Sequence, residues 1–133
     1  MEKILDSVLN DFNALSKEVK DKAELRKKIR ARVRELPSLI SSFGIRTVLY
    51  FYYSKVGNKE QLSDDEKAYY EVMKILIKYV KEALIHLGVN VSSDDIKEIL
   101  NNLSNVENEA KVQYYIDLPL QYLKRLIEAE FEG

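Results

Sequence analysis

Nine basic residues lie between positions 17 and 34, and only three acidic residues oppose them there. Nine minus three gives this stretch a formal charge of +6, although the whole chain carries −1. Guanidinium and ammonium groups that are close together attract polyanions. Arg binds phosphate better than Lys does, because its guanidinium group can donate two hydrogen bonds at once. The chemistry that these residues predict is contact with phosphate groups. The basic residues are Lys17, Lys20, Lys22, Arg26, Lys27, Lys28, Arg30, Arg32 and Arg34.

The spacing of these residues predicts a helix that sorts them by side. At about 100° per residue, the apolar residues between Leu25 and Ile40 occupy an arc of about 80°. A ladder of Arg26, Arg30 and Arg34 follows beside that arc, and Lys28 and Arg32 lie on its other flank. Like charges four residues apart are unfavourable in an isolated helix, so we expect few internal partners and an external anion. The alternative is a solvated helix face whose partners are acidic residues elsewhere in the fold.

The residues expected to contact phosphate include two lysines before the helix and one arginine after Gly44. The chain has no helix-turn-helix signature, no aromatic RNA-binding strand motif and no glycine-rich phosphate loop. A nucleic acid would therefore be contacted through its backbone and shape rather than through base edges. The candidate nucleic-acid contacts are Lys20, Lys22, Arg26, Lys27, Arg30, Arg34 and Arg46.

Residues for other chemistry are few. The chain has no cysteine, which excludes a thiolate zinc site, a disulfide and a catalytic thiol. His86 is the single histidine and has no second ligand with which to form a familiar metal site. The acidic pairs at 64–65 and 94–95 stand where helices should begin, which explains them through the helix dipole. The sequence thus predicts no catalytic residue, no metal site and no cofactor.

The apolar residues recur at spacings of three and four, which is typical of helices. We predict an all-α fold, a compact bundle of five to six helices formed by a single domain over residues 1–133. No apolar run approaches the roughly 20 residues that span a bilayer, and the first residues do not resemble a secretion signal. These features predict a cytoplasmic protein without a membrane partner. The richness in Lys, Glu, Ile and Tyr resembles thermophile usage.

In the first half of the chain the pattern predicts helices over about 2–20 and 22–43, with one long bent helix as an equal alternative. Pro37 should kink or restart the second helix, because proline lacks the amide hydrogen and clashes with the preceding turn. Gly44 should end it as a left-handed cap. Residues 45–56 are apolar nearly all round, which predicts a central helix, with a strand as the minor alternative.

In the second half, Ser63 and Glu66 form a capping box that begins a helix ending at Gly88. A short helix follows the polar residues 92–95. The last helix should run over about 105–131, where Pro119 predicts a kink or a restart.

Tyrosines occur in three adjacent pairs, at 52–53, 69–70 and 114–115. In each pair at least one ring must point away from the buried face of its helix. Tyr suits half-exposed positions and interfaces, because its body is apolar and its hydroxyl is polar. Protein contact, base stacking and ordinary packing at the edge of the core remain alternatives.

The stretch 27–45, KKIRARVRELPSLISSFGI, resembles the small all-helical subunit of the type III-B CRISPR Cmr effector complex. That family combines a basic helix, Leu-Pro, an aliphatic pair, a glycine and an apolar helix ending in aromatics. Residues 122–129 are similar to its last helix. The chain departs from the family at Phe43, where Asn is usual, and at Pro119, which leaves the small subunit of another type III complex as an alternative.

This resemblance implies a non-catalytic subunit that stacks with copies of itself beside the paired guide and target RNA. Its implied partners are the other subunits of the effector complex and the RNA backbone, with no small-molecule substrate. The separated charges then serve either phosphate contact or contact between neighbouring copies. A different class of function is a helical adaptor whose basic face docks an acidic protein without binding nucleic acid.

Overall fold

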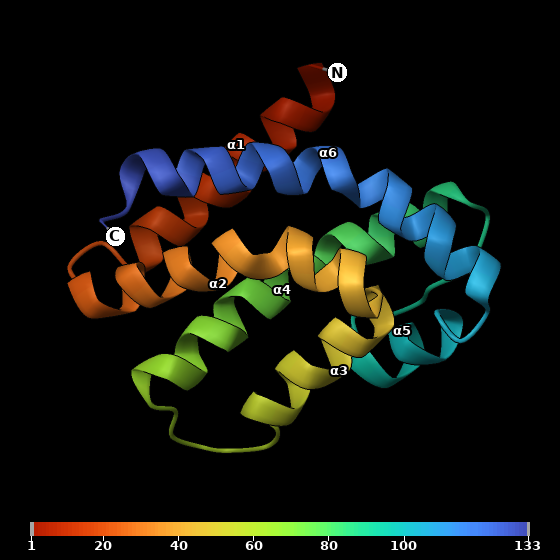
Figure 1. Ribbon diagram of the computed structural model, residues 1–133, viewed down its shortest axis with the longest axis horizontal. Coiled ribbons are helices and arrows are strands. Elements are labelled where there is room, and N and C mark those ends of the chain that lie inside the picture. The colour runs from red at the N-terminus through yellow and green to blue at the C-terminus, as the bar shows by residue number, and fades with distance from the viewer. Residues whose placement is uncertain (1, 133) are drawn as a thin grey trace.

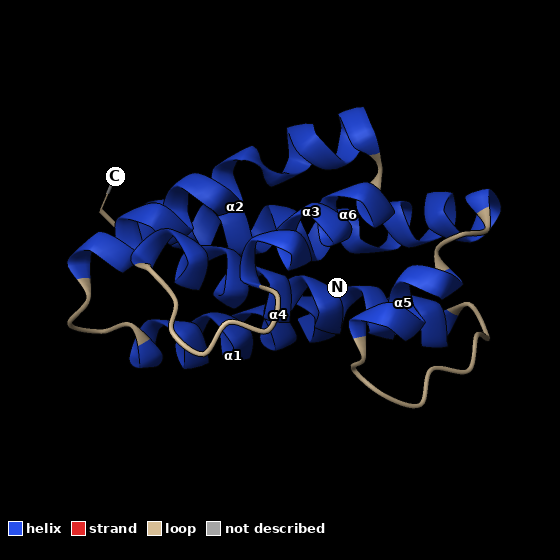
Figure 2. Cartoon of the chain, turned by 90° about the horizontal axis from the view of Figure 1, so that it is seen from below, coloured by secondary structure: helices blue, strands red, loops and turns tan. Residues whose placement is uncertain are grey.

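The computed structural model describes residues 2–132, and within that range the chain forms six helices and no strand. The predicted all-α bundle of five to six helices is confirmed. Figure 2 shows that loops are short, with the longest ones before α4 and α5. The helices are α1 (Glu2–Glu18), α2 (Ala23–Phe43), α3 (Ile45–Val56), α4 (Asp64–His86), α5 (Ile96–Asn102) and α6 (Val106–Glu130).

Helix α2 lies at the centre of the arrangement, between α4 on one side and α6 on the other (Figure 1). Helix α1 packs against α6, and the short α5 packs against α3 and α4. The predicted apolar stripe of α2 is buried throughout, because it faces both neighbours at once. Its buried residues are Leu25, Ile29, Val33, Leu36 and Ile40.

The N-terminal pattern forms two separate helices, so the single bent helix is wrong. Residues 19–22 form a turn between α1 and α2. Neither proline restarts a helix, since α2 runs through Pro37 and α6 runs through Pro119. Burial explains the continuity: Leu36 and Ile40 flank Pro37 in the core, and Pro119 is itself buried.

Helix α3 is peripheral, and the prediction of a central helix is wrong, as is the alternative of a strand. Tyr52 on its inner side is fully buried, whereas Tyr50 and Phe51 are 63% and 42% exposed. Only one side of α3 packs against α2 and α4, but its aromatic residues lie on both the packed and the exposed side.

The capping box at the start of α4 is confirmed. The hydroxyl of Ser63 accepts a hydrogen bond from the Glu66 amide (3.2 Å), and the Ser63 amide donates to the Glu66 carboxylate (2.9 Å). Lys59 also donates to this carboxylate. The Lys59 contact, and next the Ser63 amide, lower the pKa of Glu66 to about 2.

The junction between α2 and α3 is built around Gly44. Its φ of 86° is positive, as expected for a cap, but its ψ of 152° is extended rather than left-handed helical. The first amides of α3 are capped from α6: Ile45 donates to the Gln113 side chain (2.9 Å) and Arg46 donates to Glu109 Oε2 (3.0 Å). The positive φ requires glycine at position 44, and a Cβ atom there would lie 2.7 Å from that Glu109 oxygen and push the side chain aside.

Candidate nucleic-acid interface

The basic residues of α2 divide into three groups, because the buried stripe of the helix fixes which neighbour each side chain meets. One group faces α4, one faces the end of α6, and one faces solvent.

On the α4 side, the cations are held by partners within the fold. Lys28 Nζ donates to Asp65 Oδ1 at 2.7 Å, and this hydrogen bond raises the pKa of Lys28. Arg32 donates to the hydroxyl of Tyr69 at 2.6 Å, and its Nε lies 3.4 Å from the Glu35 carboxylate. Lys28 and Arg32 lie on the flank that the helical wheel predicted, and they tie α2 to α4.

On the α6 side, the arginine ladder meets acidic residues. Arg26 contacts the last residues of the chain, including Glu132, and its side chain is only 16% exposed. Arg34 Nε lies 3.9 Å from the Glu128 carboxylate. The expectation that the ladder has few internal partners is therefore wrong for these two arginines. Arg30 lies between them, and its Nε is buried without a hydrogen-bond partner among residues 2–132.

The remaining cations reach solvent and are here together called the basic face: Lys20, Lys22, Lys27, Arg30 and Arg34. Lys27, Arg30 and Arg34 line a shallow depression of about 410 Å³. Lys20 and Lys22 are exposed in the turn that precedes α2. In the part of the chain that the structure describes, the side chains of Lys20, Lys22, Lys27 and Arg30 have neither an ion pair nor a hydrogen bond. The basic face thus keeps donors that are available to an external anion.

Arg46 does not join the basic face. It lies in the first turn of α3, where its Nε donates to the carbonyl oxygen of Leu100 at 3.0 Å. The 18 residues from Arg26 to the end of α2 at Phe43 span about 25 Å along the helix axis. Arg46 lies beyond that point, and its side chain is hydrogen-bonded to α5.

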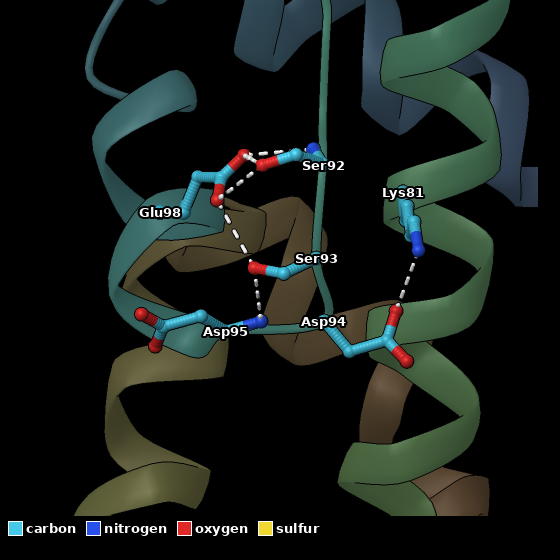
Figure 3. Close-up of polar contacts among 6 residues, drawn as sticks. All are labelled: Lys81, Ser92, Ser93, Asp94, Asp95 and Glu98. Atoms are coloured by element: carbon cyan, nitrogen blue, oxygen red, sulfur yellow. Dashed lines mark hydrogen bonds and ion pairs between the residues drawn. The ribbon is translucent and has the colours of Figure 1, made fainter.

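The acidic pairs open helices, as predicted. Asp95 caps α5 by accepting a hydrogen bond from the Lys97 amide at 3.1 Å. Figure 3 shows Asp94 turned toward Lys81 of α4 (2.9 Å), while Glu98 accepts hydrogen bonds from Ser92 and Ser93. Across residues 2–132 there is no group of three or more His, Cys, Asp or Glu side chains that could hold a metal ion.

His86 is exposed at the end of α4, where its ring centroid lies 4.9 Å from that of Tyr115. Over the same described residues, no helix has the length and apolar character needed to cross a membrane.

Two of the three tyrosine pairs have an exposed ring, as predicted, at Tyr70 and Tyr114, whereas Tyr53 is half-buried against the core. Tyr52 is buried beside the half-buried Tyr53, and Tyr114 is 89% exposed. Burial raises the pKa of Tyr52, whose hydroxyl has no hydrogen-bond partner within the described chain.

Sequence reasoning missed the part played by the end of the chain. Residues 128–132, Glu-Ala-Glu-Phe-Glu, alternate acidic with apolar residues and contact the arginine ladder directly. That acidic run was visible in the sequence, but nothing in the sequence alone placed it beside Arg26.

The fold and its surfaces define a small all-α protein whose second helix presents a basic face. Residues 9–130 match the protein family described as CRISPR-associated protein (Cas_Cmr5). The chain belongs to this family, the small subunit of the type III-B CRISPR effector complex, and the resemblance of residues 27–45 is confirmed. Neither the curated proteins nor the solved structures include a match to the chain.

Proposed function

We propose that this chain is a non-catalytic, cytoplasmic subunit of its effector complex that contacts the backbone of the guide and target RNA through the basic face. Copies of the chain stack along the RNA, and cleavage belongs to other subunits. The observation that carries this proposal is the set of unpaired cations at Lys20, Lys22, Lys27 and Arg30 in the described part of the chain. Three of them are exposed and Arg30 is half-buried, and they occur in a family whose complex is RNA-guided.

The charge of the basic face explains how a subunit can ignore base sequence. Lys and Arg neutralise phosphates and release counterions, which gives affinity without reading base edges. The depression lined by Lys27, Arg30 and Arg34 is shallow, which suits a backbone lying across it rather than a base inserted into it.

Binding of labelled single-stranded RNA, measured against salt concentration, tests the proposal. With about five phosphate contacts, the slope of log affinity against log salt should be near −3.5. The Lys27→Ala/Arg30→Ala/Arg34→Ala variant should bind unrelated sequences equally weakly, with a slope nearer roughly −1.4.

A matched control removes the same charge elsewhere: Lys3→Ala/Lys67→Ala/Lys97→Ala changes exposed lysines of α1, α4 and α5. Equal loss in both variants would mean that only net charge matters. Copies that stack should also bind in a number that grows with RNA length, as measured by sedimentation.

The second candidate is an adaptor that docks an acidic protein. The contacts of Arg26 and Arg34 with carboxylates favour it, because they show that this side of α2 accepts acidic side chains. The absence of RNA binding at low salt would support the adaptor and refute the RNA-contacting subunit.

A further inference from the structure

Residues 130–132 make three kinds of contact with the Arg26 side chain. The guanidinium Nη2 donates a hydrogen bond to the carbonyl oxygen of Glu130 at 3.1 Å. Its Nε lies 3.7 Å from the Glu132 carboxylate, and its central carbon lies 4.4 Å from the centroid of the Phe131 ring. Figure 1 shows the end of α6 beside the beginning of α2, where Arg26 lies.

These contacts give the C-terminal end of α6 a hydrogen-bond donor and a positive charge. The last carbonyl groups of a helix lack internal partners and carry a partial negative charge. Helix α6 has no basic residue in its last turn, and Arg26 of α2 supplies the cation instead. The same guanidinium donors would serve a phosphate, because carboxylate, carbonyl and phosphate oxygens are alternative acceptors for Arg.

A second acidic residue at the end of α6, Glu128, contacts the other end of the arginine ladder: its carboxylate lies 3.9 Å from Arg34 Nε. Arg30 stands between the two occupied arginines with its Nε buried and unpaired in the described chain. The carboxylates of Glu128 and Glu132 thus bracket the side of the basic face that borders α6.

The segment from Glu128 to Glu132 is anchored by the apolar side chain of Phe131 and not by its charged side chains. Phe131 is 3% exposed and packs against Phe12 of α1 with ring centroids 5.8 Å apart. The side chain of Glu132, in contrast, is 73% exposed. The Glu132 carboxylate can therefore swing away from Arg26 while Phe131 keeps the end of α6 in place, whereas Glu128 is 30% exposed and also lies 4.0 Å from Lys124 Nζ.

We infer that the acidic end of α6 and the two residues after it, Glu128 to Glu132, are a built-in competitor for phosphate on Arg26 and Arg34. RNA displaces the carboxylates of Glu128 and Glu132 from the ladder as it binds. The competition lowers the affinity of a single free subunit for stray RNA, and it is overcome where several copies align on one strand. This inference rests on the proposed RNA contact of the basic face.

The test compares Glu128→Gln/Glu132→Gln with the wild-type chain in binding a labelled single-stranded RNA at low salt. Exposed ion pairs are worth up to about 1 kcal/mol each, so the variant should bind roughly three- to tenfold more tightly. The control is Asp21→Asn/Glu24→Gln, which removes two exposed carboxylates near the same basic stretch that form no ion pair in the described chain. It should show a smaller gain, set by net charge alone.

A second readout follows the arginines themselves. In a titration with the same RNA, the 15N resonances of Arg26 Nε and Arg34 Nε should shift in the wild-type chain, because their acceptors change. Unshifted resonances with normal RNA binding would overturn the competitor.

The outcomes separate this inference from the proposed function. If both double variants bind RNA equally well, the competitor is refuted while the basic face stands. If the wild-type chain and both variants all fail to bind, the competitor and the RNA contact both fall.

Discussion

Replacing Gly44 by alanine should destabilise the chain through two separable effects. The backbone at φ 86° and ψ 152° is nearly restricted to glycine, and forcing alanine into it costs about 2 kcal/mol. The added Cβ would also lie 2.7 Å from Glu109 Oε2. The flexible Glu109 side chain would move aside and lose its hydrogen bond to the Arg46 amide, which we value at about 1 kcal/mol. The total loss should be about 3 kcal/mol.

Gly57→Ala provides the matched comparison, since Gly57 has a φ of 53° but no atom lies within 4 Å of the position that its Cβ would take. It should lose only about 2 kcal/mol in urea unfolding. The gain from restricting the unfolded chain is the same for both changes and cancels in the difference. Adding Glu109→Ala to Gly44→Ala should cost almost nothing further. Equal losses for Gly44→Ala and Gly57→Ala would refute the role given to Glu109.

Two further changes test buried and charged groups. Tyr52→Phe should raise the free energy of unfolding in urea by about 1 kcal/mol, because it removes a buried hydroxyl without a partner in the described chain. The half-buried Tyr53→Phe is its control, and a loss of stability at Tyr52 would show that the hydroxyl is satisfied. Glu66, with a pKa of about 2 in the fold and about 4.3 unfolded, stabilises the fold above pH 4.3 and loses that contribution as the pH falls toward 2. Glu66→Gln should therefore flatten the thermal stability between pH 5 and pH 2, and parallel curves for wild type and variant would contradict this, with Glu60→Gln as a control for lost charge.

The helices themselves were predictable because their signals are local. The apolar stripe of α2 has the helical period, and the capping box at Ser63 is made by residues three positions apart. Helix α3 was misjudged because Tyr and Phe tolerate half-exposed positions, so an apolar sequence all round did not imply burial all round. The prolines did not restart helices because packing on both sides outweighed one lost backbone hydrogen bond.

The basic face was only partly predictable. The charge pattern located the cations, and the wheel placed Lys28 and Arg32 on their own flank correctly. The wheel could not show that Arg26 is occupied, because its partner at Glu130 lies 104 residues further along the chain. Arg46 was added because it follows the Gly44 turn, yet the fold directs it toward Leu100.

The capping of α3 by α6 also has a consequence for the order in which the protein can be completed during synthesis. The acceptors for the Arg46 and Ile45 amides lie 63 and 68 residues later in the chain. At about 5–20 residues per second, a ribosome reaches them roughly 3 to 14 s after making the amides that they cap. For that interval the nascent α2–α3 junction has water as its partner, and the bundle closes only when its last helix emerges.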